Sequence, residues 1–153
     1  MSTRSESRQG HSGGGVTGKR VDIRLDDVRF GARPDAQLFA AIAESKAQKI
    51  ADSSREDKKN EPNKSSQLRR FYDELVMWHE KVASSDEEFE RLQPYIYMLK
   101  AKVAYAKGRR RVDGNFEALF SRVIDQCTDA ATLRQAKLFM EAFMAFYKVH
   151  NNK

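Results

Sequence analysis

The strongest constraint on the fold of this chain is a helical repeat of large apolar side chains that begins near residue 65. In the first stretch these side chains recur every three or four residues, which places them on one face of an α-helix over about four turns. They are Leu68, Phe71, Leu75, Trp78 and Val82. No strong strand signal and no alternation of strands with helices interrupts residues 65–150, so we predict an all-α protein.

Capping and helix-breaking residues divide this region into separate helices. Ser85 and Glu88 form a capping-box pattern that begins a short helix. Pro94 is expected to break or kink the chain and to open a long helix, which Gly108 would end in a left-handed conformation. Two further apolar stripes beyond Gly108 predict two more helices. The expected fold class is a compact helical bundle of four to five main helices.

The residues before this region differ from it in composition. A Ser-Gly-Gly-Gly run at positions 12–15 and few apolar groups predict a flexible N-terminal arm. Alternation of Val21, Ile23 and Leu25 leaves a short strand or a docking segment open within that arm. We predict two parts, a flexible extension over 1–33 and a helical bundle domain over 34–153. The domain would consist of a first helix over 34–51, a linker over 52–64 and a bundle core over 65–150.

Composition excludes several classes of protein. Cys127 is the only cysteine, so an internal disulfide framework is excluded and a reducing compartment is expected. No apolar stretch approaches the roughly 20 residues that cross a bilayer, and the N-terminus lacks the apolar core of a signal peptide. We therefore expect a cytoplasmic protein with no membrane partner.

The motifs give no support for a catalytic or metal-binding site. Residues 13–20 (GGGVTGKR) nearly match a phosphate-binding P-loop, but Arg20 stands where the motif needs a magnesium-binding hydroxyl, and no strand precedes it. Zinc needs about four closely spaced ligands, whereas Cys127 and the three histidines are scattered. Cys127 continues an apolar stripe, which indicates a buried core thiol. We predict no enzyme activity, no cofactor and no metal site.

The main local concentration of charge lies between Glu90 and Asp113. The net charge of the whole chain is only +6, but this stretch contains no acidic residue. Its cations are Arg91, Lys100, Lys102, Lys107, Arg109, Arg110 and Arg111. Such cations can neutralise phosphates, and the interleaved Tyr105 suits stacking on a base or packing against a sugar. Arg69 and Arg70 are two further candidates. Cations in the first turn of a helix are mildly destabilising, so their presence there favours another role, such as phosphate contact.

Ordinary structural explanations exist for part of this pattern. Lys107 and the arginines after it lie at a helix C-terminus, where the helix dipole stabilises a cation by about 0.3–1 kcal/mol. The tyrosines can complete the core with their hydroxyls outward. Arg69 and Arg70 are within reach of Asp73 and Glu74 on the same helix. Capping explains one or two cations, however, and not seven without an acid among them. The charge pattern therefore favours polyanion binding.

Three segments carry a recognisable family pattern. They are SSQLRR at 65–70, YMLKAKVAYAKGR at 97–109 and FMEAFMAFYK at 139–148. The first is similar to the serine-x-leucine-arginine helix start of the small subunit of type III-A CRISPR effector complexes, in the Csm family. The second resembles that family's leucine-basic, tyrosine and glycine-arginine signature, and the third its final helix rich in phenylalanine and methionine. The three lie in the family's order over residues 65–150.

The resemblance implies a non-catalytic helical subunit that acts in antiviral defence. Several copies would stack along a ribonucleoprotein and contact the RNA backbone without reading bases. Its partners would be guide RNA, target RNA, the backbone and large Csm subunits and additional copies of itself. The RNA-binding residues would be Arg69, Lys100, Tyr105 and Arg109, which match family positions, and Arg70, Lys102, Lys107, Arg110 and Arg111, which are included from local charge. The alternative is a helical adaptor that binds an acidic protein partner and no RNA.

Overall fold

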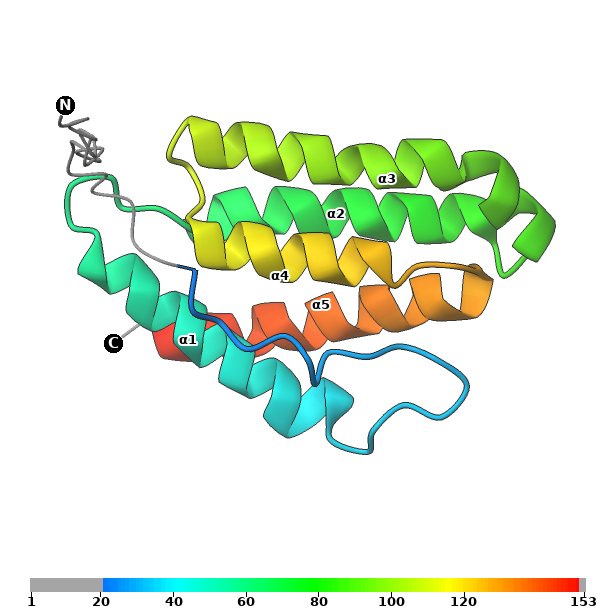
Figure 1. Ribbon diagram of the computed structural model, residues 1–153, viewed down its shortest axis with the longest axis horizontal. Coiled ribbons are helices and arrows are strands. Elements are labelled where there is room, and N and C mark those ends of the chain that lie inside the picture. The colour runs from blue at the N-terminus through cyan, green and yellow to red at the C-terminus, as the bar shows by residue number, and fades with distance from the viewer. Residues whose placement is uncertain (1–20, 152–153) are drawn as a thin grey trace, which may run out of the picture.

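The computed structural model describes residues 21–151, and within that range the chain forms helices and no strands (Figure 1). The elements are a π-helical turn at Leu38–Ile42, α1 at Ala43–Glu56, α2 at Ser65–Val82, α3 at Asp86–Gly108, α4 at Gly114–Asp125 and α5 at Ala130–Asn151. The predicted all-α bundle of four to five main helices is confirmed.

The helices α2, α3, α4 and α5 lie roughly along one direction, whereas α1 crosses α5 obliquely (Figure 1). Helix α3 packs against both α2 and α4, α5 packs against α2, and α1 packs mainly against α5. Exposed residues on one flank of α3 therefore lie next to α2, and those on the other flank lie next to α4. The basic residues of α3 accordingly meet side chains of two different helices.

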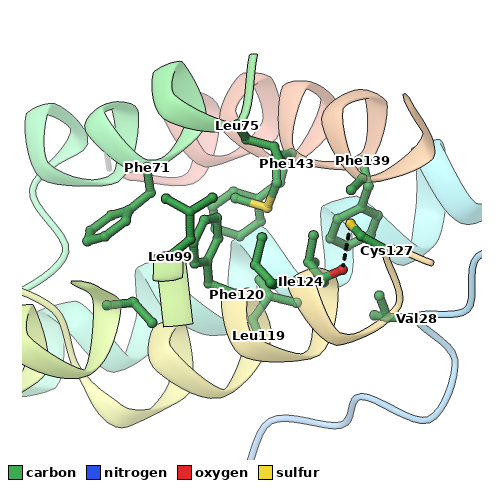
Figure 2. Close-up of a cluster of buried hydrophobic side chains, with 14 of the residues drawn as sticks. Val28, Phe71, Leu75, Leu99, Leu119, Phe120, Ile124, Cys127, Phe139 and Phe143 are labelled. Carbon is green, nitrogen blue, oxygen red and sulfur yellow. Dashed lines mark hydrogen bonds between the residues drawn. The ribbon is translucent and has the colours of Figure 1, made fainter. Parts of the chain in front are cut away.

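Aromatic rings at the centre of the bundle join α2, α4 and α5. The ring of Phe71 lies 5.3 Å from that of Phe120 and 5.8 Å from that of Phe116, measured between centroids. Phe116 in turn lies 6.2 Å from Phe143. Figure 2 shows Leu99 of α3 entering the same buried cluster. Burial of one such side chain stabilises the fold by about 1.5–3 kcal/mol, so this cluster holds the four helices together.

Residues 21–33 differ from the predicted flexible arm, because they pack against the bundle. Val28 is fully buried at the edge of the core (Figure 2). The backbone of the segment is held by amide side chains of the helices: Asn115 accepts from Ile23 N at 3.3 Å, and Gln126 accepts from Phe30 N at 2.8 Å. Gln135 of α5 both accepts from Gly31 N and donates to Gly31 O.

These amides satisfy backbone groups that would otherwise require a partner strand. An ion pair of 2.8 Å between Asp27 and Lys46 fixes the segment to α1. The side chain of Lys46 is only 3% exposed. The alternating apolar residues near position 21 therefore belong to a docking segment and not to a strand. The rest of the predicted extension, residues 1–20, lies outside the described residues.

The first helix begins later and ends later than predicted. Pro34 precedes the helical part, which starts with the π-helical turn at Leu38 and continues as α1 to Glu56. Leu38 and Ile50 are fully buried, so both ends of this element are held by packing. The connection to α2 is consequently residues 57–64 and not 52–64.

The predicted separate short helix before Pro94 is wrong, whereas α3 ends at Gly108 as predicted, without the expected left-handed conformation there. The helix continues through Pro94, although proline removes one backbone hydrogen bond. Leu92 and Ile96, buried on either side of Pro94, hold the helix against the core and offset that cost. Gly108 is simply the last residue of α3, and the left-handed residue is Arg110, with φ of 61°.

Candidate nucleic-acid interface

The turn that ends α3 is held by the loop that leads into α2. Buried Asn63 donates from its backbone N–H to Arg111 O at 2.9 Å. Its side-chain Oδ1 accepts from the N–H of Asp113, also at 2.9 Å. The turn closes on itself where Arg111 N donates to Ala106 O at 2.9 Å. Since Asn63 lies two residues before α2, these contacts place the turn of residues 109–111, the arginine turn, beside the first turns of α2.

A groove of about 450 Å³ lies between the first half of α2 and the second half of α3. It is lined by Gln67, Arg70, Phe71, Glu74, Lys102, Tyr105, Ala106, Arg109 and Arg111. Five of the nine predicted RNA-binding residues line this groove: α2 supplies Arg70, α3 supplies Lys102 and Tyr105, and the turn after α3 supplies Arg109 and Arg111. Four cations therefore converge on a single hollow that contains one carboxylate, that of Glu74.

Tyr105 and Arg109 form a pair on the exposed side of α3. The Arg109 guanidinium donates to the Tyr105 hydroxyl at 3.1 Å, and its central carbon lies 5.8 Å from the centre of the tyrosine ring. The hydrogen bond from Arg109 lowers the pKa of the Tyr105 hydroxyl. Tyr105 is 66% exposed, so the ring does not complete the core. An exposed aromatic face held next to a cation suits contact with a sugar or a base.

The lysines of α3 are paired with carboxylates from neighbouring helices. Lys102 lies 2.8 Å from Glu74 of α2. On the other side of α3, Lys100 lies 2.5 Å from Asp125 of α4, and Lys107 lies 3.7 Å from Glu117 of α4. The sequence between Glu90 and Asp113 contains no acidic residue, but carboxylates of α2 and α4 neutralise its lysines in the folded chain.

The arginines have different surroundings. Three arginine side chains form no ion pair and no hydrogen bond with any residue in the described range 21–151. They are those of Arg70, Arg110 and Arg111. All three are exposed. Pairing of Arg70 with Glu74, left open by the sequence, does not occur because Glu74 contacts Lys102. Among the predicted RNA-binding cations, the three lysines are thus paired with carboxylates and the arginines are not, within the part of the chain that the structure describes.

Four predicted residues lie outside the groove. Lys100 and Lys107 face α4, and Arg110 is exposed in the turn after α3. Arg69 faces the opposite side of α2, where it lines a second hollow of about 420 Å³ together with residues of α5. That hollow includes Lys148 and the carboxylate of Glu141. The nine predicted residues therefore do not form a single surface.

Two residues of this region act in ways that the sequence did not predict. Glu74 was expected as a partner of Arg69 or Arg70, but it neutralises Lys102 of α3 inside the groove. Asn63 positions the arginine turn, but its partners lie 48 and 50 residues away. No local pattern indicates such contacts.

Other chemistry has little support in the described chain. Cys127 is buried, and desolvation raises the pKa of its thiol to about 12, which agrees with a core thiol and not with a nucleophile. Between residues 21 and 151 no three His, Cys, Asp or Glu side chains gather as metal ligands would. In that same range no helix is long and apolar enough to span a membrane. The P-loop-like residues 13–20 lie outside the described residues.

Comparison with family models matches residues 40–153 to the model described as Csm2 Type III-A. The match begins in the π-helical turn and includes α1 to α5, so it contains every residue that lines the groove. Curated proteins and solved structures gave no match.

Proposed function

Because the chain belongs to the Csm2 Type III-A family, the small subunit of the type III-A Csm complex, we propose that it is a non-catalytic, RNA-binding structural subunit of that ribonucleoprotein. In this function it contacts the backbone of guide RNA and target RNA without sequence specificity, in the cytoplasm. It associates with the backbone and large subunits and with further copies of itself. This role in antiviral defence requires no chemistry from the chain itself.

The groove between α2 and α3 is the observation that best supports the proposal. Arg70, Arg109 and Arg111 bring three cations to it without a carboxylate partner, and Lys102 adds a fourth. Arginine suits phosphate because its planar guanidinium donates two parallel hydrogen bonds. Apart from Glu74 and the amide of Gln67, the polar side chains that line the groove are four cations and one tyrosine, which suits contact with the phosphate backbone.

The mechanism is electrostatic. Each cation that contacts a phosphate releases a condensed counterion, so affinity falls as salt rises. Four contacts to a single strand predict a slope of about −3 in a plot of log affinity against log salt concentration. Between 50 and 200 mM salt the affinity should therefore fall about fiftyfold. One copy alone binds weakly under these conditions, and neighbouring copies on one RNA raise the total affinity.

Filter binding of the purified full chain to RNAs of unrelated sequence tests the proposal. The expected result is retention at low salt, equal among the RNAs within a few-fold, with the slope given above. Polyglutamate serves as the competitor for the alternative, in which the same cations bind an acidic protein partner. Retention of polyglutamate with no retention of RNA would establish the adaptor and exclude the RNA-binding subunit.

A further inference from the structure

A third hollow lies at the opposite end of the α2–α3 pair from the groove lined by Arg70, Arg109 and Arg111, called here the arginine groove. It encloses about 430 Å³ and is lined by Trp78, Lys81, Arg91, Leu92 and Tyr95. Apart from buried Leu92, these are aromatic or cationic side chains. None of the nine predicted RNA-binding residues belongs to this hollow.

The two aromatic rings of this hollow form a near-parallel pair. The centroids of Trp78 and Tyr95 lie 6.1 Å apart, and the ring planes differ by 15°. Tyr95 is 57% exposed, although a tyrosine that only filled the core would be covered. The ammonium group of Lys81 lies 5.1 Å from the centre of the Trp78 ring. The rings are thus held in place, with part of the tyrosine face open to solvent.

This aromatic pair is continuous with the arginine groove along one side of α3. The exposed side chains follow each other at intervals of three and four residues, which keeps them on one stripe of the helix. They are Arg91, Tyr95, Met98, Lys102, Tyr105 and Arg109. Tyr95 and Tyr105 are separated by about 15 Å along the helix axis. A stacked strand advances about 3.4 Å per nucleotide, so this distance corresponds to about four or five nucleotides.

Charge and shape favour a nucleic acid as the occupant over a protein. Lys81 and Arg91 provide cations at the edge of the hollow, and Arg91 shares its charge with Glu88 at 2.7 Å on the exposed surface, where a phosphate can displace the carboxylate. Parallel rings with an open face suit a flat heterocycle, because every base presents a π-face of the same kind. A strand that leaves the arginine groove along α3 arrives at this point.

We propose that the Trp78–Tyr95 pair stacks against an unpaired base of the RNA whose backbone occupies the groove between α2 and α3. The assignment rests on the proposed RNA-binding function. It adds a single-stranded nucleotide, recognised by stacking, to a subunit otherwise expected to contact only the backbone. Lys81 and Arg91 then neutralise the phosphates next to that base.

Trp78 is the only tryptophan of the chain, so its fluorescence reports on this hollow alone. The full chain is titrated with three RNAs of equal length: a single strand, the same strand with abasic sites throughout, and a perfect duplex. Stacking of a base on the pair predicts strong quenching by the single strand and little by the other two. Filter binding of the same samples measures retention separately from quenching.

Two matched variants test whether the pair contributes affinity. Tyr95→Ala removes the exposed ring and should weaken binding of single-stranded RNA about fivefold or more, the usual effect of one lost aromatic–base stack. Val149→Ala is the control, because Val149 is 62% exposed on α5 and lines neither the groove between α2 and α3 nor the hollow of Trp78 and Tyr95. It should leave affinity unchanged within twofold, and both variants should keep the helical circular dichroism.

Several results would overturn the proposal. Retention of single-stranded RNA without quenching of Trp78 would reject base stacking and leave the proposed function intact. Equal quenching by the abasic strand or the duplex would reject it too, because no unpaired base is then involved. Quenching that follows protein concentration in the absence of RNA would assign the hollow to a protein contact. Absence of retention for every RNA would reject the proposed function together with this proposal.

Discussion

The two flanks of α3 carry similar positive charge but differ in what surrounds it. On the flank that faces α4, Lys100 and Lys107 are paired with Asp125 and Glu117. On the flank that faces α2, Arg109 and the nearby Arg111 meet no carboxylate within residues 21–151. Both lysines on the α4 flank are therefore neutralised, whereas on the α2 flank only Lys102 is, by Glu74, although the sequence over this stretch contains only basic charge.

The difference shows that cation density in a sequence is an incomplete measure of a phosphate-binding surface. A lysine already paired with a carboxylate must give up that contact before it binds a phosphate. An exposed pair of this kind contributes only about 0–1 kcal/mol, so the exchange is feasible, but it reduces the gain from each phosphate contact. The unpaired arginines give up no such contact. We therefore expect the two flanks to contribute unequally to RNA affinity, and three changes test this.

The largest effect is expected from the triple variant Arg70→Gln, Arg109→Gln, Arg111→Gln. Each lost phosphate contact removes about 0.7 from the magnitude of the salt slope and lowers affinity about fivefold near 0.1 M salt, so three losses predict about a hundredfold. Filter binding across a salt series measures both quantities.

The control for this variant is Lys58→Gln, Lys59→Gln, Arg134→Gln, which removes the same net charge from exposed positions outside the groove. It should change affinity by no more than about threefold, since only the long-range field is altered. An equal loss in both variants would mean that net charge alone drives binding and that the groove has no special role.

An intermediate effect, of opposite sign, is expected from Glu74→Gln. The substitution removes the only carboxylate of the groove and releases Lys102 from its contact at 2.8 Å. Lys102 then binds its phosphate without first giving up an ion pair worth about 0–1 kcal/mol, which predicts a gain in affinity of up to about fivefold with little change in the salt slope. Asp73→Asn is the matched control, because Asp73 carries the same charge on the adjacent position of α2 but does not line the groove. A gain of similar size in the control would show that the groove is not where RNA binds.

The smallest effect is expected from Lys100→Gln combined with Lys107→Gln. Both lysines are already paired, so RNA affinity should fall by no more than about threefold, well below the effect of the arginine triple variant. The free energy of unfolding should fall by about 1 kcal/mol or less for each pair, because both are exposed to solvent. Urea denaturation and filter binding measure the two effects. A loss of RNA affinity equal to that of the arginine variant would remove the distinction between the two flanks.

Much of the fold was predictable because helices and their caps are local. The spacing of Leu68, Phe71 and Leu75 predicts α2, and Ser85 at its N-cap position accepts from Glu88 N in the structure, as the capping pattern indicates. The failures concern residues whose conformation is set by distant partners. Pro94 stays helical because buried neighbours outweigh one lost hydrogen bond, and residues 21–33 are ordered by amides from α4 and α5.

The candidate site was predictable in type but not in extent. Local charge identified Arg109 and Arg111, and the proximity of α2 then brought Arg70 to the same groove. The same reasoning included Lys100 and Lys107, which the structure places on the flank that faces α4. Sequence spacing could not separate these groups, because the carboxylates that neutralise the lysines belong to another helix.

The sequence by itself therefore determined a helical bundle, the concentration of cations at the end of α3 and the family pattern, since all three depend on neighbouring or regularly spaced residues. Tertiary structure alone decided which of those cations remain unpaired. Ion pairing depends on distance through space, and the packing of α3 between α2 and α4 sets the distances from its lysines to Glu74, Asp125 and Glu117.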